Sequence, residues 1–349
     1  MIDGSELLIT GGCGSLGKAI IAELLANHKP RGIRVYSRDE AKHWRFQQEL
    51  PDDAPVSFLI GDVRDKSRLY RAMQGVDFVI HTAAIKQVPV AERDPIEAIR
   101  TNIDGAVNVV DAALDAGVRR VMNCSTDKAP HAANLYGATK RVAESLFTAA
   151  NVYRSGSEKY ELGRYFDQHD FPNGGQKPLP YKAPNCTRFA SCRWGNVLGS
   201  RGSVIQLWQQ QHEDGKPLTV TDPTMTRFWI TVERAARFIL ARLQDMHGGE
   251  IFIPNMPSSS MQFILDTLYP GAETVSTGIR DGEKKHECMI TVEEARQMKR
   301  NKTSYSGDEK QYYIIDPNTR NDNEVFEWRS NTNEWSLTET ELRAMIGES

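Results

Sequence analysis

Near its start the chain reads LLITGGCGSLG, from Leu7 to Gly17. The apolar run Leu7–Thr10 is too short for a helix and is followed at once by glycines, so it predicts a buried β-strand. From Lys18 to Asn27 apolar residues recur at helical spacing, which predicts a helix. A strand, a glycine-rich turn and a helix therefore follow one another at the beginning of the chain.

The glycines of this turn suit the pyrophosphate of a dinucleotide. Gly11 allows a tight turn out of the strand, Gly14 lets a pyrophosphate approach the backbone, and Gly17 allows the helix to pack closely on the sheet. Ser15 and Leu16 of the turn are also predicted to bind the cofactor, and the positive dipole end of the helix that follows faces the phosphates. A plain glycine-rich turn is the alternative, and the flanking strand and helix weigh against it.

The rest of the first half alternates between strands and helices. A long helical pattern runs from Asp94 to Ala116 and ends at Gly117, a typical helix stop. Further strands are predicted at residues 33–36, 56–60, 77–81, 120–124 and 186–194. This alternation predicts a parallel sheet with right-handed crossovers, which is the doubly wound, Rossmann-like α/β fold.

We expect two units in a chain of this length. Residues 1–195 are predicted to form the dinucleotide-binding domain, with an irregular, polar insert at about 151–185. Residues 196–349 are predicted to form a smaller substrate-binding lobe, part of which returns to the sheet.

Composition excludes several classes of function. The 349 residues carry 43 Lys and Arg against 46 Asp and Glu, so no basic excess exists for binding a nucleic-acid backbone. No apolar stretch approaches the roughly 18–20 residues that span a bilayer, and we see no signal peptide. The five cysteines form no C-x-x-C pair, so we expect no disulfide framework and no metal site. These features predict a cytoplasmic protein with reduced thiols.

The end of the second predicted strand favours NADP over NAD. NAD-binding proteins place a carboxylate about 20 residues after the glycines, to bind the ribose 2′-hydroxyl. Counting 20 residues from Gly17 reaches Ser37, and Arg38 follows it. A serine and a guanidinium can hold a 2′-phosphate that a carboxylate would repel. Asp39 and Glu40 come next and would serve NAD only in a different register.

Asp62 and Val63 follow shortly after the third predicted strand, and both are predicted to contact the cofactor. Asp62 is placed to reach the adenine. A strand-end cap made by its carboxylate is an equally good interpretation of the same position.

Tyr136 and Lys140 lie four residues apart at the start of a predicted helix that runs toward Ala150, so they share one face. A phenol with a pKa near 10 is a poor base at neutral pH. A nearby lysine ammonium, together with a nicotinamide cation, favours the phenolate and makes Tyr136 a usable proton acceptor. Ser125 and Thr126 end the fifth predicted strand, where a hydroxyl can bind the substrate oxygen being oxidised. The set predicts a dehydrogenase/reductase site.

Asp127 and Lys128 follow directly, at the edge of the sheet where such folds build their sites. An extra acid and base imply a second proton transfer, which removes a C–H proton next to the new ketone and protonates a leaving hydroxyl. On charge alone, a solvated ion pair is an equally good interpretation.

Several stretches together resemble the extended short-chain dehydrogenase/reductases, and more narrowly the inverting UDP-N-acetylglucosamine 4,6-dehydratases. The resemblance runs from about Leu7 to His286, except for the insert. The stretches that carry it are Thr10–Gly17, Tyr36–Glu40, His81–Pro89, Ser125–Ala129, Tyr136–Lys140, Trp194–Val204, Met225–Phe228 and Gly278–Lys284.

The resemblance implies a redox cycle within one site. Tyr136 takes the proton of the sugar 4-hydroxyl while a hydride passes from C4 to NADP+. Lys128 then removes the C5 proton and Asp127 protonates the departing 6-hydroxyl. NADPH returns the hydride to C6, and reprotonation on the opposite face inverts C5. The implied substrate is a nucleotide sugar, UDP-N-acetylglucosamine, and we expect a homo-oligomer.

The resemblance also implies contacts for the ligands. It places Ala83, Ala84 and Lys86 in the cofactor site. The residues that it places on the sugar or the UDP part are Lys86, Asn196, Arg201, Arg227 and Arg280. Guanidinium groups suit a diphosphate because they offer bidentate donors, although a surface ion pair is the alternative for each arginine. Glu283 and Lys284 have no implied role.

The chain also departs from the pattern of that family. Trp194 stands where a tyrosine is usual, Gln206 where a proline is expected, and Pro130–Ala133 differs from the expected segment. The insert has no counterpart, and we expect it to cover the sugar-nucleotide pocket or to form a subunit contact. One alternative function is a nucleotide-sugar 4-epimerase or ketoreductase that uses Tyr136 and Lys140 only. Another is a non-catalytic NADP-sensing protein on the same fold.

Overall fold

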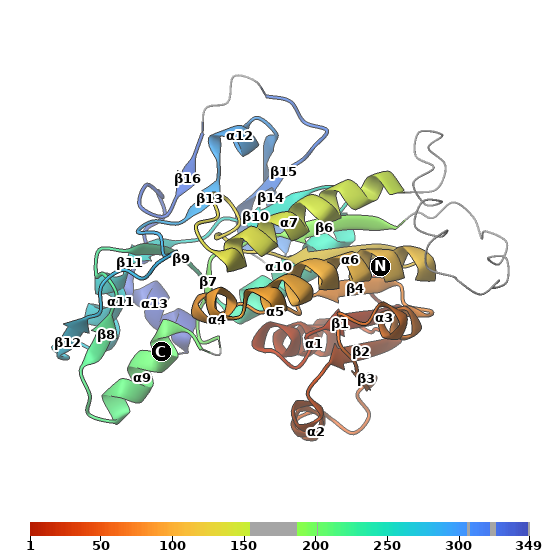
Figure 1. Ribbon diagram of the computed structural model, residues 1–349, viewed down its shortest axis with the longest axis horizontal. Coiled ribbons are helices and arrows are strands. Elements are labelled where there is room, and N and C mark those ends of the chain that lie inside the picture. Colours follow the sequence, from red (N-terminus) through yellow and green to blue (C-terminus); the bar gives the residue numbers. More distant parts are fainter. Residues whose placement is uncertain (154–186, 201, 306–307, 322–325, 348–349) are drawn as a thin grey trace.

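The structure is a computed structural model that describes residues 1–153, 187–200, 202–305, 308–321 and 326–347. Its centre is a nine-stranded sheet with the order β14-β15-β10-β6-β5-β4-β1-β2-β3. Helices cover both faces of this sheet (Figure 1). None of the helices in the described ranges is both long enough and apolar enough to cross a bilayer.

Six parallel strands form the part of the sheet that the sequence predicts. Each neighbouring pair among them is parallel, which confirms the doubly wound α/β fold. The order reverses next to β1, because β1 pairs with β2 on one side and with β4 on the other, and such a switch point is where these sheets bind ligands. The six strands are β1 (Glu6–Thr10), β2 (Gly32–Ser37), β3 (Val56–Ile60), β4 (Phe78–His81), β5 (Arg120–Cys124) and β6 (Arg188–Cys192).

The C-terminal half of the chain extends the same sheet. The strand β10 (Ile251–Pro254) pairs in parallel with β6. The strands β14 (Met298–Tyr305) and β15 (Asp308–Ile315) then pair antiparallel and complete that edge. Residues beyond 195 therefore belong to the sheet as well as to the smaller lobe, and the domain boundary at 195 stays a prediction.

Five long helices pack directly on the two faces of the sheet. The helices α1 (Ser15–Asn27) and α10 (Val232–Asp245) contact each other on one face. The opposite face carries α3 (Lys66–Met73), α6 (Gly105–Ala116) and α7 (Leu135–Ala149). The other helices in this half are α2 (Glu40–Gln48), α4 (Val88–Arg93), α5 (Pro95–Ile99) and the 3₁₀ turn η2 (Ala150–Tyr153).

The remaining elements form the smaller lobe and its link to the sheet. Its helices are α9 (Val204–Glu213), α11 (Met261–Leu268), α12 (Val292–Ala295) and α13 (Glu339–Ile346). Its short strands are β7 (Asn196–Val197), β8 (Leu218–Val220), β9 (Thr226–Ile230), β11 (Ser258–Ser260), β12 (Thr274–Ser276), β13 (Cys288–Ile290) and β16 (Trp328–Arg329). The lobe has an apolar core of its own, centred on the buried Trp208 and Trp229.

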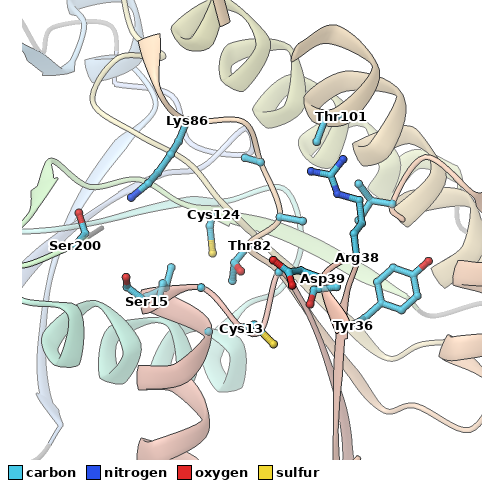
Figure 2. Close-up of a pocket in the computed structure, with 18 of the residues that line it drawn as sticks. Cys13, Ser15, Tyr36, Arg38, Asp39, Thr82, Lys86, Thr101, Cys124 and Ser200 are labelled. Carbon is cyan, nitrogen blue, oxygen red and sulfur yellow. The ribbon is translucent and has the colours of Figure 1, made fainter. Parts of the chain in front are cut away.

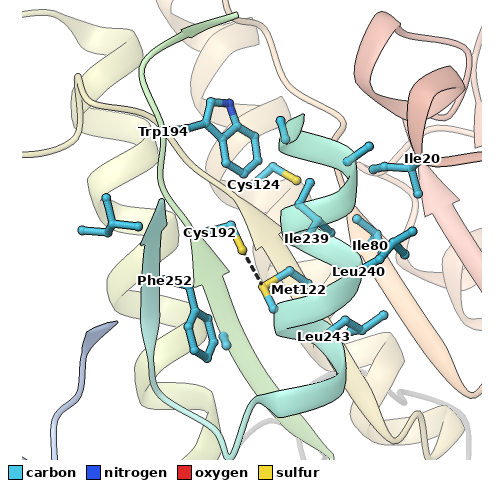
Figure 3. Packing of buried hydrophobic residues seen from close by; sticks show 14 of the residues in the cluster. Ile20, Ile80, Met122, Cys124, Cys192, Trp194, Ile239, Leu240, Leu243 and Phe252 are labelled. Carbon is cyan, nitrogen blue, oxygen red and sulfur yellow. Dashed lines mark hydrogen bonds between the residues drawn. The ribbon is translucent and has the colours of Figure 1, made fainter. Parts of the chain in front are cut away.

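The side chains of the central strand β1 alternate between the two faces of the sheet, and both faces are buried there. Leu7 and Ile9 belong to the cluster with α1 and α10, whereas Leu8 belongs to the cluster with α3, α6 and α7. Figure 3 shows Ile239 and Leu240 of α10 beside Met122 of β5 and Ile80 of β4. A strand buried on both faces must be apolar throughout, which is why LLIT was recognisable as a central strand.

The pattern predicted as one helix from Asp94 to Ala116 is interrupted. The helix α5 is followed by a π-helical turn, η1 (Arg100–Asp104), and only then by α6. The amide of Asn102 explains the interruption, because it bonds the N–H and the carbonyl of Ile85 at 2.8 and 2.9 Å. The predicted stop is confirmed, since Gly117 ends α6 with a left-handed φ of 69°.

Candidate active site

A cleft of 380 Å³ opens at the carboxyl ends of the central strands, next to the switch point of the sheet (Figure 2). Its wall begins with the glycine-rich turn after β1 and continues over the ends of β2, β3, β4 and β5. Predicted site residues that line it are Gly11, Gly14, Ser15, Leu16, Gly17, Ser37, Arg38, Asp62, Val63, Ala83, Ala84, Lys86, Tyr136 and Lys140.

The glycine-rich turn leaves room for a phosphate group. Gly11 has a φ of +69°, and a Cβ there would lie 2.9 Å from backbone atoms of Ala83. A Cβ on Gly17 would lie 2.5 Å from the backbone of Gly12, so the helix packs closely on the turn. No side chain caps the first turn of α1, because its N-cap is Gly14. The amides of a helix start without such a cap fit the phosphates of a dinucleotide.

At the end of β2, two side chains of opposite charge have different surroundings. The Asp39 carboxylate accepts a hydrogen bond from Lys42 N at 3.0 Å, which caps α2, and it pairs with Lys42 Nζ at 2.7 Å. The Arg38 side chain is 56% exposed, and its Nη1 lies 3.6 Å from Asp62 Oδ2. Arg38 therefore has a guanidinium available to a ligand, whereas the carboxylate that would suit NAD is already bonded.

Asp62 acts as a local cap in this structure. Its carboxylate accepts from Arg64 N at 3.0 Å and pairs with Arg64 Nη2 at 2.6 Å. Burial raises its pKa, but the hydrogen bonds and the charge of Arg64 outweigh burial and hold the pKa below its usual value. The strand-end interpretation of Asp62 is thus confirmed, and its contact with adenine stays a prediction.

The structure adds residues to the cleft that sequence reasoning did not identify, among them Thr101 and Lys42. The Thr101 hydroxyl is buried and has no hydrogen-bond partner within the described ranges, so it is free to bond a ligand. It comes from η1, and the π-helical turn that directs it was not visible in the sequence pattern. In Figure 2 the Lys86 side chain extends over the cleft toward the side formed by Ser200, and burial lowers its pKa.

Tyr136 and Lys140 both line the cleft from α7, as their spacing predicts. Asn134 caps this helix by accepting from Gly137 N at 2.8 Å. Burial raises the pKa of Tyr136 to about 12, and the charge of Lys128 and a hydrogen bond with Thr126 oppose that rise. The Lys140 ammonium instead donates to the carbonyl oxygen of Cys124 at 2.6 Å. The charge of Lys128 therefore acts on the phenol as well, and the role of Lys140 beside Tyr136 stays a prediction.

Asp127 and Lys128 form a buried pair. Asp127 Oδ1 accepts from Lys128 Nζ at 3.0 Å and from the Thr126 hydroxyl at 3.0 Å. The Asp127 side chain is 0% exposed, so the solvated-pair interpretation is wrong. Its Oδ2 atom has no hydrogen-bond partner among the residues that the structure describes. Burial raises the pKa of Asp127, which favours a protonated acid.

A second carboxylate, Glu287, reaches the same lysine. Its Oε1 lies 3.5 Å from Lys128 Nζ, and its Oε2 lies 2.9 Å from Lys284 Nζ. Burial lowers the pKa of Lys128, but the charges of Asp127 and Glu287 outweigh burial and raise it above its usual value. The sequence contained one signal for this contact, the Gly278–Lys284 stretch that ends just before Glu287.

The residues predicted to bind UDP have other partners in this structure, which holds no ligand. Asn196 Oδ1 accepts from Lys128 Nζ at 3.4 Å, next to the acid–base pair. Arg227 is buried and donates to the carbonyl oxygens of Thr226, Lys284 and Lys285 at 2.7, 3.0 and 3.0 Å. Arg280 is exposed and lies 3.8 Å from Glu283. Arg201 and the 151–185 insert, apart from residues 151–153, lie outside the described residues.

The fold brings together three side chains of metal-ligating type, His131, Cys288 and Glu327, with ligand atoms within 4.8 Å of one another. Arg329 already holds both oxygens of the Glu327 carboxylate, at 2.7 and 2.8 Å. Burial raises the pKa of the Cys288 thiol to about 12, so the thiolate that a metal needs is disfavoured. The donor set therefore fits a metal poorly.

The chain is similar to known polysaccharide biosynthesis proteins and nucleotide-sugar enzymes. The family model described as polysaccharide biosynthesis protein matches residues 7–309. The chain is 44% identical over 296 residues to a UDP-N-acetylglucosamine 4,6-dehydratase (inverting) of Campylobacter jejuni strain 81-176, covering 84% of this chain and 80% of that protein. It is 36% identical to a UDP-glucose 4-epimerase of Rickettsia conorii, covering 82% and 78%. Among solved structures, Pen from Bacillus thuringiensis matches with a TM-score of 0.82 and 31% identity, over 100% of this chain and 99% of that one.

Proposed function

The chain belongs to the polysaccharide biosynthesis protein family, and on this premise we propose that it is an NADP-dependent nucleotide-sugar 4,6-dehydratase. The proposed substrate is UDP-N-acetylglucosamine, and the proposed product is a UDP-4-keto-6-deoxy sugar with C5 inverted. We place the reaction in the cytoplasm, in keeping with the free thiols of Cys13, Cys124, Cys192 and Cys288.

The observation that carries the proposal is the buried Asp127–Lys128 pair beside Tyr136. An epimerase or ketoreductase moves one proton and one hydride at C4, for which a tyrosine and a lysine suffice. Elimination of water needs an additional base at C5 and an additional acid at O6. A carboxylate and an ammonium 3.0 Å apart, with the carboxylate fully buried, provide such a pair.

Tyr136 begins the reaction by accepting the proton of the 4-hydroxyl. Its pKa of about 12 in this structure must fall for that step, and the nearby Lys128 charge already favours the phenolate. When bound, NADP supplies a hydride acceptor for C4 and returns the hydride to C6. Residues of the glycine-rich turn, Arg38 and Lys86 would hold it.

Elimination uses the acid–base pair in its neutral form. A proton moves from Lys128 Nζ to Asp127 Oδ1 across their 3.0 Å hydrogen bond, which leaves an amine and a carboxylic acid. The amine removes the C5 proton, and the electrons of that C–H bond form the C5–C6 double bond. The C6–O6 bond breaks, and the hydroxyl leaves as water with the proton of Asp127. After a hydride has added to C6, the resulting enolate takes a proton from solvent at C5 on the opposite face, which inverts the centre.

The test is to incubate the purified protein with UDP-, dTDP- and GDP-sugars and to examine the products by mass spectrometry. A dehydratase gives a keto product that has lost one water, and in heavy water the product carries deuterium at C5. A 4-epimerase gives neither signal, and a non-catalytic protein gives no product at all. Unchanged substrate mass with every sugar, in the presence of NADP, would overturn the proposal.

We expect Arg38→Ala to weaken NADP binding by about 10- to 100-fold and NAD binding far less, because a charge-assisted hydrogen bond contributes about 1.5–3 kcal/mol. The Arg38 guanidinium is exposed at the end of β2 beside the cleft. Calorimetric titration of both cofactors measures the effect, with Arg45→Ala on α2 as the control. Equal affinity of the unaltered protein for NAD and NADP would contradict the choice of cofactor.

We propose that a homo-oligomer forms through the outer surface of α5, α6 and α7. Four apolar side chains are exposed there, Ile96 at 64%, Ile99 at 39%, Val107 at 38% and Val142 at 45%, and the three helices are in contact. Exposed apolar patches of this kind mark association surfaces. We expect Val142→Glu to lower the mass measured by light scattering to that of the monomer. The alternative outcome, an unchanged mass, would place the contact elsewhere.

A further inference from the structure

The segment that precedes β13 lies against the loop that carries the acid–base pair. Asn134, the N-cap of the helix with Tyr136, donates from Nδ2 to the carbonyl oxygen of Gly282 at 2.8 Å. Lys284 Nζ donates to the carbonyl oxygen of Pro130 at 3.1 Å. Two hydrogen bonds therefore join residues about 150 positions apart in the sequence, just after the acid–base pair.

This contact brings Glu287 to the lysine of the pair. Lys128 Nζ lies between two buried carboxylates, with Asp127 Oδ1 at 3.0 Å and Glu287 Oε1 at 3.5 Å. Glu287 is 2% exposed. Its charge is balanced by Lys284 Nζ, which lies 2.9 Å from Oε2. Its backbone N–H donates to the Ser330 hydroxyl at 3.0 Å, which holds this part of the chain.

We propose that Glu287 is a positioning residue of the elimination step, which holds Lys128 Nζ at the acid–base pair and is itself held by Lys284. The inference rests on the proposed dehydratase function and extends it to a residue with no role in the mechanism above. Lys128 has a flexible four-carbon side chain, and ion pairs of its ammonium with two carboxylates restrict its position. Because Lys284 balances the charge of Glu287, the carboxylate can remain ionised while buried.

The groups around Lys128 determine how a change at Glu287 affects protons. Two carboxylates face it, Asp127 and Glu287, and two cations act on the same cluster, Arg227 and Lys284, with the Tyr136 phenol nearby. Removing the negative charge of Glu287 leaves the cluster more positive. Both Lys128 and Asp127 then bind protons less tightly, because Glu287 raises the pKa of each of them.

The experiment replaces Glu287 by glutamine, which keeps the shape of the side chain and removes its charge. We expect kcat for water loss to fall by up to about a hundredfold, because a displaced catalytic group loses its alignment. We also expect both limbs of the pH profile of kcat to move to lower pH, by about one pH unit. Glu287→Asp should return both limbs of the pH profile to their positions in the parent protein and should restore only part of kcat. Glu273→Gln, an equal charge change on the exposed surface of the same lobe, should alter neither.

A second measurement needs no turnover and separates the two proposals. In protein labelled at the lysine side-chain carbons, with Lys128→Met used for assignment, NMR should show Lys128 losing its proton at lower pH in Glu287→Gln. If the Lys128 signal and both pH limbs stay unchanged while the parent protein still dehydrates sugars, the role of Glu287 is overturned and the function stands. If the parent protein dehydrates no sugar and the NMR shift is still observed, the proposed function fails while the contact is confirmed.

Discussion

Lys128→Ala should give no detectable dehydrated product, with turnover reduced by at least about 10²- to 10⁴-fold, the usual contribution of a general base. The amine that removes the C5 proton is lost. Its removal also leaves Asp127 and Glu287 buried without the cation that lies 3.0 and 3.5 Å from them. NADP binding should change little, because the glycine-rich turn and Arg38 line the cleft and Lys128 is not among its lining residues. Mass spectrometry of the product and a calorimetric titration of NADP measure the two effects.

Lys285→Ala is the matched control for that variant. Lys285 is a half-exposed lysine that lies 4.0 Å from Asp222 and comes from the same segment as Lys284. It should retain close to full turnover. If Lys128→Ala dehydrated the sugar at a rate near that of Lys285→Ala, the base would have to be another residue, and the proposed elimination step would be wrong.

Arg193→Met should lower the free energy of unfolding by about 3–5 kcal/mol, the cost of removing one partner from a buried ion pair. The Arg193 guanidinium is fully buried and binds Glu144 of α7 at 2.8 and 2.7 Å. It also binds Glu294 of α12 at 2.9 and 2.8 Å. Methionine fills similar space but leaves two buried carboxylates without their main partner. Urea unfolding followed by circular dichroism measures the loss.

Arg141→Met is the control for Arg193→Met. It also removes a cation that pairs with Glu144 and Glu294, but this cation lies at the surface. Arg141 is 47% exposed and lies 2.8 Å from Glu294 and 3.5 Å from Glu144. Exposed pairs contribute about 0–1 kcal/mol, so the loss should be small. Equal losses in the two variants would contradict the importance of the buried network.

The loss of unfolding free energy caused by Arg193→Met should also depend on pH. Burial raises the pKa of Glu294, but the charge of Arg193 and its hydrogen bonds outweigh burial and lower it from its usual 4.5 to about 2. A lowered carboxyl pKa adds stability that is complete above pH 4.5 and is lost as the pH falls toward 2. The difference between the parent protein and Arg193→Met should therefore shrink over that interval.

The parallel part of the fold was predictable because each of its signals is local. The apolar run of β1, the glycines after it and the stop at Gly117 each require only neighbouring residues to be interpreted. The interrupted helix was not predictable, because the π-helical turn depends on the bond between Asn102 and Ile85 of a different loop. Strand β14 was also missed, since this polar edge strand lacks the apolar run that marks β1.

The candidate site likewise has one part that was predictable from the sequence and another that was not. Asp127, Lys128, Tyr136 and Lys140 come from one stretch, and their chemistry was visible in their order and spacing. The bond of Lys140 to the carbonyl oxygen of Cys124 and the effect of the Lys128 charge on the phenol were not visible, because both depend on the folded structure. Glu287 joins this group only through tertiary contacts, and no spacing rule connects it with Lys128.

Because Lys128 depends on Glu287, the residues for cofactor binding and the residues for elimination are completed at different stages of translation. All residues that line the cofactor cleft have been translated once Ser200 has been added. The Glu287 carboxylate beside Lys128 arrives only later in translation. An emerging chain thus contains all of its cleft-lining residues before it contains the carboxylate that aligns the elimination step.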